Sequence, residues 1–86
     1  MKADRAEISQ LVKTARGQLE GVLKMIDDDR YCIDISNQIM AAMAVLKKAN
    51  REIIKAHMNC CVREAIGSEG AEQKIAELSL LIEKLS

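Results

Sequence analysis

The residues with the clearest chemical potential in this sequence are one histidine and two cysteines, His57, Cys61 and Cys32. On a helix, His57 and Cys61 project from the same face, because residues four positions apart lie about one turn apart. A neutral imidazole together with a thiolate is a favoured ligand pair for Zn(II) and Cu(I). A lone histidine on an apolar helix face is as often a buried, hydrogen-bonded residue, so this pair alone leaves both interpretations open.

Cys32 would complete a set of two sulfur atoms and one nitrogen atom, with no fourth protein ligand evident. Three-coordinate, thiolate-rich binding favours Cu(I), whereas Zn(II) usually takes four ligands. Cys60 is rotated by about 100° from Cys61 on a helix, so the two neighbours cannot bind one ion with the same geometry. Cys60 is therefore a candidate redox residue, a spare thiol or a packing residue.

The elements that must position these residues are expected to be helices. The 86 residues contain no proline, no phenylalanine, no tryptophan and only four glycines, a composition that suits long helices. Apolar spacing predicts a first helix from about Asp4 to Asp27 and a second from about Ile35 to Ile66, with Asp34 as its N-cap. Gly67-Ser68-Glu69-Gly70 predicts a stop, with Ser68 as a cap for a third helix over 71–85. We expect one all-α domain over residues 1–86, with three helices and a long middle helix.

The distance between the ligand candidates indicates how the protein must assemble if they share one site. Cys32 lies 25 positions before His57, a separation of about 37 Å along a straight helix. The two residues cannot meet within one such helix, but they can meet if two copies of the helix pack antiparallel. The sequence therefore predicts a dimer with two metal sites, each shared between the subunits.

The charge distribution limits how the protein could contact nucleic acid. Thirteen basic and thirteen acidic residues give a formal net charge of zero, so such contact must depend on a local basic surface. The first predicted helix carries a basic arc that is also typical of an ordinary solvated face, and no helix-turn-helix is recognisable. This arc consists of Lys2, Arg5, Lys13, Arg16 and Lys24.

The composition also predicts where the protein is located, how its cysteines are used and what its glycines and methionines do. No signal sequence and no long uncharged apolar run is visible, so we expect a cytoplasmic protein, in which three cysteines favour metal or redox chemistry over disulfides. Gly17 and Gly21 share one side of the first predicted helix at a cost of about 1 kcal/mol each, which indicates a packing role. The five methionines are expected to fill the core.

Four parts of the chain resemble the CsoR/RcnR family of metal- and thiol-responsive transcriptional repressors. These are Arg16-Gly17-Gln18-Leu19-Glu20-Gly21, Tyr31-Cys32-x-Asp34-Ile35, Gln38 and His57-x-x-x-Cys61-Val62. The likeness runs in order over residues 5 to 85. It implies an all-α homodimer, an antiparallel four-helix bundle, that assembles into a homotetramer and binds operator DNA without a helix-turn-helix. In the copper-sensing branch, metal binding releases the DNA.

The resemblance also implies roles for individual residues. Cu(I) would be held by Cys32 of one protomer and by His57 and Cys61 of the other. Tyr31 and Glu77 match outer positions that link the ligand histidine to the rest of the assembly, where they could transmit metal occupancy to the DNA-binding surface. The expected DNA contacts are Lys13, Arg16, Gln18, Lys47 and Lys48.

Comparison among branches of the family favours copper. Nickel- and cobalt-responsive members use an N-terminal histidine that this chain lacks. Formaldehyde-responsive members lack the cysteine at Cys61, and persulfide-sensing members lack the histidine at His57. Thr14 stands where the family usually carries arginine, which lowers the expected strength of DNA contact.

Two alternatives remain open at this point. One is a persulfide- or thiol-responsive repressor that works through Cys32 and Cys61, with Cys60 modulating the response. The other is a copper-storage or delivery module without a role at DNA. An enzyme is not expected, because the sequence shows no nucleophile–base pair and no phosphate-binding loop.

Overall fold

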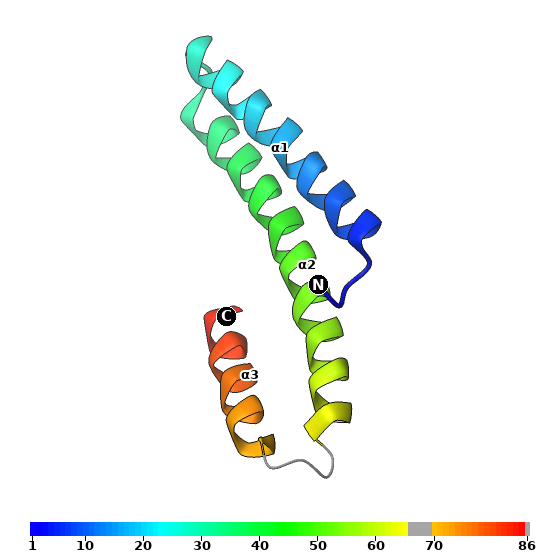
Figure 1. Ribbon diagram of the computed structural model, residues 1–86. Helices are drawn as coiled ribbons and strands as arrows, with labels where there is room; N and C mark the ends of the chain where they lie inside the picture. The colour runs from blue at the N-terminus through cyan, green and yellow to red at the C-terminus, as the bar shows by residue number, and fades with distance from the viewer. Residues whose placement is uncertain (66–69, 86) are drawn as a thin grey trace.

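Two long antiparallel helices and one short helix make up the described chain. The computed structural model describes residues 1–65 and 70–85, with side chains described for 1–60, 70 and 72–84. The helices are α1, Arg5–Asp27, α2, Cys32–Ala65, and α3, Ala71–Leu85. α1 packs along the first part of α2, and α3 turns back along its last part (Figure 1). The predicted all-α architecture with a long middle helix is confirmed.

α1 begins at a side-chain cap. The Asp4 carboxylate accepts hydrogen bonds from the backbone N–H groups of Ala6, at 3.0 Å, and Glu7, at 3.3 Å. Such a cap satisfies N–H groups that have no partner within the first turn, and a carboxylate there also suits the helix dipole. The predicted limits of the first helix therefore hold, with Asp4 as the cap rather than the first helical residue.

A tight turn joins α1 to α2. Asp29 adopts φ of 53°, and the N–H groups of Asp29 and Arg30 donate to the carbonyl oxygens of Ile26 and Met25, both at 3.0 Å. This pair of bonds around a left-handed residue is a Schellman motif, which reverses the chain within a few residues. The acidic run at 27–29 thus ends the helix as expected.

The prediction that Asp34 caps the second helix is wrong. α2 already begins at Cys32, and the Ile35 N–H donates to the Tyr31 carbonyl oxygen at 3.2 Å. Asp34 lies inside the first turn, where its carboxylate favours the positive end of the helix dipole. The reason is the compact turn at Asp29, which lets helix start three residues sooner. The predicted end at Ile66 and the predicted cap Ser68 lie outside the described residues.

The three helices form a layer that is little more than one helix thick. The molecule measures 58 × 26 × 12 Å, and its shortest dimension is close to the diameter of about 10–12 Å of a single helix. Among the described residues, the buried apolar side chains lie where the helices meet, and three of them are alanines. They are Ile8, Ala15, Val22, Ala42, Ala49, Ile54 and Leu78. So thin a molecule leaves most large apolar side chains uncovered.

One broad face of the α1–α2 hairpin is apolar and exposed. Apart from Ile33 and Met40, which lie on the edge of α2 that faces away from α1, the exposed large apolar side chains of α1 and α2 point to the same side of the layer, counted at 100° per residue on two antiparallel helices. They are Val12, Leu19, Leu23 and Ile26 on α1 and Ile39, Met43 and Leu46 on α2. We call this set the apolar face. The expectation that all methionines fill the core is wrong for this chain, since Met1, Met40 and Met43 are 50–72% exposed.

The two mid-helix glycines have no packing partner within the protomer. A Cβ atom added at Gly17 or at Gly21 would meet nothing within 4 Å. In α3, Leu78 is buried while Ile75 and Ile82 are about half exposed. None of the described helices is long and apolar enough to cross a membrane.

Candidate functional site

The two described ligand candidates lie near opposite ends of α2. Cys32 is the first residue of this continuous helix, and His57 follows 25 positions later, about 37 Å away at 1.5 Å per residue. Around the helix axis they differ by only about 20°, so both side chains lie on the side of α2 that carries the apolar face. Both residues are exposed.

A single protomer does not assemble the predicted metal site. Among the described side chains, no three His, Cys, Asp or Glu residues lie close enough together to hold a metal ion. Cys61 lies in α2 one turn after His57, and its side chain is outside the described residues. Cys60 is half-buried, whereas Cys32 is exposed. Any site that uses both Cys32 and His57 therefore needs a second chain.

His57 lines a cavity of about 570 Å³ on the same side of the layer as the apolar face. The walls come from three segments: the N-terminal residues before α1, the second half of α2, and the end of α3. The lining residues are Met1, Lys2, Asn50, Ile53, Ile54, His57, Leu81 and Lys84. We call this space the His57 cavity. Sequence reasoning missed its two lysines, because no spacing rule links residues 2 and 84 to residue 57.

The predicted outer residues Tyr31 and Glu77 are separated in the protomer. Tyr31 precedes α2 and is 68% exposed, and it lies about 39 Å from His57 along the helix by the rise per residue. Glu77 is exposed on α3, one turn before Leu81 of the His57 cavity. Tyr31 could therefore reach a ligand histidine only on another protomer, at the end where Cys32 stands.

The predicted DNA-contacting residues do not share one surface of the hairpin. Lys13 is exposed on the side of α1 that faces away from α2, whereas Arg16 is exposed beside Leu23 of the apolar face. Lys47 is exposed on the edge of α2 away from α1, and Lys48 is exposed on the broad face opposite the apolar face. Gln18 is different, because its side chain is half-buried and its Oε1 atom is enclosed without a hydrogen-bond partner among the described residues.

The exposed basic row on α2 continues beyond the expected residue Lys48. Lys48, Arg51 and Lys55 are all exposed, and their spacing of three and four residues places them along one stripe of the helix. By helical geometry this stripe lies on the broad face opposite the apolar face. The three- and four-residue spacing of these basic residues is visible in the sequence. It was missed because the apolar residues of the same segment alone were used to predict the helix.

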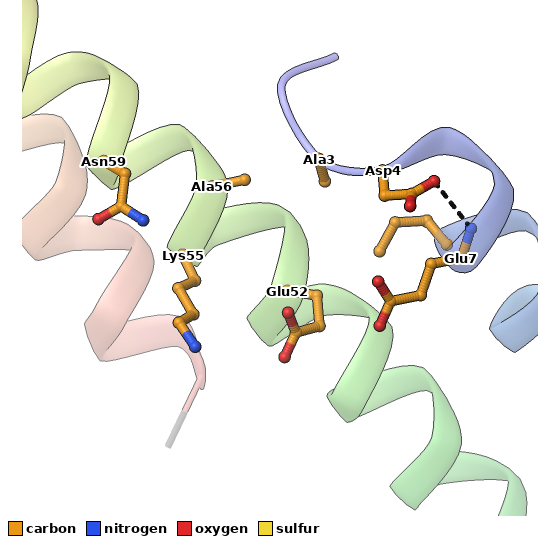
Figure 2. Close-up of a pocket in the computed structure, with 8 residues that line it drawn as sticks. Ala3, Asp4, Glu7, Glu52, Lys55, Ala56 and Asn59 are labelled. Atoms are coloured by element: carbon orange, nitrogen blue, oxygen red, sulfur yellow. Dashed lines mark hydrogen bonds between the residues drawn. The ribbon is translucent and has the colours of Figure 1, made fainter.

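A second, smaller cavity of about 170 Å³ separates the start of α1 from α2. Figure 2 shows the Glu7 and Glu52 carboxylates directed into the gap between the helices, with Asp4 capping α1 beside them. Lys55 and Asn59 contribute from the next turns of α2. This cavity lies on the face opposite His57 and includes no cysteine or histidine, so it is not part of the candidate metal site.

Comparison with known sequences assigns the family. A family model described as metal-sensitive transcriptional repressor matches residues 4–84. The copper-sensing transcriptional repressor CsoR of Bacillus subtilis (strain 168) is 35% identical over 83 residues, covering 96% of this chain and 82% of that protein. The copper-sensing transcriptional repressor RicR of Mycobacterium tuberculosis (strain ATCC 25618 / H37Rv) is 36% identical over 76 residues, covering 86% of this chain and 79% of that protein.

Solved structures show the same arrangement of helices. The copper-sensing repressor CsoR with Cu(I) from Geobacillus thermodenitrificans NG80-2 matches with a TM-score of 0.83 and 37% identity, over 98% of this chain and 91% of that chain. The nickel-responsive transcriptional regulator InrS matches with a TM-score of 0.83 over 100% of this chain and 97% of that chain. At 24% identity the second match supports the fold alone. The expectation of a regulator rather than an enzyme is confirmed, and the chain belongs to the family of metal-sensitive transcriptional repressors.

Proposed function

We propose that this protein is a Cu(I)-responsive transcriptional repressor that binds operator DNA in its metal-free form and releases it when Cu(I) binds. The observation that carries the proposal is the placement of Cys32 and His57 on one side of α2, at opposite ends of an exposed apolar stripe. The relatives named as copper-sensing repressors support the choice of metal.

The first step of the proposal is a homodimer formed through the apolar face. Met43 is 50% exposed and Leu46 is 40% exposed, and four apolar side chains of α1 are uncovered beside them. Covering such a surface with a second copy supplies the core that a layer one helix thick lacks. The hairpins of two protomers would then stack as an antiparallel four-helix bundle.

The second step is the register of that dimer. A two-fold axis places equivalent points of the two α2 helices at equal distances from the axis. The midpoint between Cys32 and the pair His57 and Cys61 falls at about residue 45 or 46 of α2 by residue number. Exposed Leu46 stands at this point, so the register that joins the ligands also centres the contact on apolar side chains.

The donor set suits Cu(I). Two thiolates and one imidazole are soft ligands of low number, which favours Cu(I) over harder divalent ions. The protomer offers no competing cluster of three ligands among its described side chains, so binding would require both chains. When bound, Cu(I) would link the start of one α2 to the end of the other. The contribution of the protein is to hold these ligands on one continuous helix.

The third step concerns the DNA. If the apolar faces meet in the dimer, the opposite face of each hairpin turns outward and presents Lys48, Arg51 and Lys55. Lys13 lies at the outer edge of α1, and Arg16 lies at the border between that edge and the apolar face. Because both hairpins contribute to these outer surfaces, a change in register at the metal site would alter the spacing of the phosphate contacts. Assembly of two such dimers into a homotetramer would extend this basic surface along the operator.

Titration of Cu(I) into the complex with promoter DNA tests the proposal. We expect the DNA affinity, measured by fluorescence anisotropy under anaerobic conditions, to fall by about 5- to 150-fold at stoichiometric metal, the usual range of allosteric coupling. The His57→Ala variant should bind DNA as the metal-free wild type does but should not release it.

The matched control is Cys60→Ser, which removes the neighbouring thiol and leaves the three proposed ligands in place. It should retain the response to Cu(I). Unchanged DNA affinity of the wild type at stoichiometric Cu(I) would overturn the proposal. Release by polysulfide but not by Cu(I) would overturn it in favour of a thiol sensor.

A further inference from the structure

The His57 cavity has mostly apolar walls but also carries positive charge. Two of its lining residues are lysines, one from the segment before α1 and one from the last turn of α3. None of the described residues that line it is acidic. Lys2 and Lys84 lie 82 positions apart in sequence, so only the folding of the chain brings them to one cavity beside His57.

The charge of the proposed centre differs between metals. Two thiolates and a neutral imidazole give a complex of charge −1 with Cu(I), and a neutral complex with Zn(II). A nearby ammonium group stabilises the first complex and has little net interaction with the second. This attraction is stronger at a partly enclosed protein surface than in bulk water, because the effective dielectric constant there is lower.

We propose that Lys2 and Lys84 make the site selective for Cu(I) over Zn(II) by balancing the negative charge of the bis-thiolate Cu(I) complex. The inference rests on the proposed function, since it assumes that Cu(I) binds beside His57. The softness of the donor atoms alone does not separate Cu(I) from Zn(II), because Zn(II) also binds thiolate and imidazole. The lysines add a preference that depends on the total charge of the complex.

The placement of the cavity agrees with this role. In the dimer proposed above, the start of the partner's α2 lies over the His57 cavity, where the thiolate of Cys32 enters. The two ammonium groups would then share the cavity with the His57 side chain and the entering thiolate. Glu77, one turn along α3 from Leu81, carries opposite charge but does not line the cavity. The net charge facing the centre from the described lining residues is therefore positive.

Affinity measurements with two metals test the inference. The variants Lys2→Gln, Lys84→Gln and their combination would be titrated anaerobically with Cu(I) or Zn(II) against chromophoric chelators. We expect the Cu(I) affinity to fall by about three- to tenfold for each lysine removed, with the Zn(II) affinity nearly unchanged. The fall should shrink between low and high salt, because both lysines are exposed to solvent.

Two controls separate charge from structure. Lys84→Arg keeps the charge and should keep the ratio of the two affinities, and Lys24→Gln removes a lysine on the outer edge of α1 and should also keep it. An unchanged ratio in the double variant, or an equal fall in Lys24→Gln, would overturn the inference. Absence of stoichiometric Cu(I) binding by the wild type would instead overturn the proposed function itself.

Discussion

At the scale of single residues, no contact within the protomer explains why positions 17 and 21 are glycine. Both lie inside α1, and an added Cβ would meet nothing within 4 Å. By helical geometry they lie on the face of the hairpin opposite the apolar face, together with the basic row of α2. A glycine that costs helix stability and contacts nothing in its own chain indicates a close approach by something outside it.

The substitution Gly21→Ala tests this reasoning. We expect the free energy of unfolding to rise by about 0.5–1 kcal/mol, because alanine has the higher helix propensity and the site has room for a methyl group. Urea unfolding at fixed protein concentration, followed by circular dichroism, measures the change. A stability equal to or below that of the wild type would contradict the packing described for α1. Loss of operator affinity in the more stable variant would place this face against DNA.

At the scale of elements, the turn between α1 and α2 determines where the candidate ligand Cys32 stands. Asp29 adopts φ of 53°, a conformation in which a side chain is unfavourable. Its carboxylate also lies just beyond the C-terminus of α1, where the helix dipole disfavours negative charge. The turn therefore retains a residue that stability alone would not select.

The substitution Asp29→Gly should relieve both effects. We expect the protein to be stabilised by about 0.5–1 kcal/mol, since glycine adopts the left-handed conformation without a steric cost. Thermal unfolding followed by circular dichroism measures the gain. Asp28→Gly serves as the matched control, because it also removes a carboxylate at the end of α1, but Asp28 has a negative φ and glycine relieves no left-handed strain there. A gain in Asp28→Gly alone would contradict this account of the turn.

The same turn shows how far the elements could be predicted from the sequence. The periodicity of apolar residues located all three helices, and the acidic run at 27–29 marked the break correctly. It did not locate the start of α2, because Asp34 has the residue type of a cap. The Schellman motif depends on two backbone hydrogen bonds to Ile26 and Met25 that follow from geometry and not from residue type.

At the scale of the whole molecule, the sequence identified the ligand candidates but not their surroundings. Spacing along one helix linked His57 to Cys61, and the rise per residue predicts that Cys32 can join them only from another chain. Lys2 and Lys84 could not be predicted as neighbours of His57, because three separate segments form the cavity. The apolar periodicity of α1 also could not distinguish side chains that pack on α2 from those left exposed.

A site shared between two chains leads to a prediction that no site within one chain can satisfy. Cys32→Ala and His57→Ala each remove one ligand from both proposed sites, so neither variant alone should bind Cu(I) at wild-type affinity. If equal amounts are unfolded together and refolded, about half of the dimers should contain one chain of each kind. Each such dimer has one intact site, made of Cys32 from one chain and His57 with Cys61 from the other. We therefore expect the mixture to recover about a quarter of the wild-type Cu(I) sites, measured by anaerobic titration against a chelator.

Variants refolded separately and then combined without exchange provide the control. Recovery of no sites in the co-refolded mixture would contradict a shared centre, because the ligands would then have to come from a single chain.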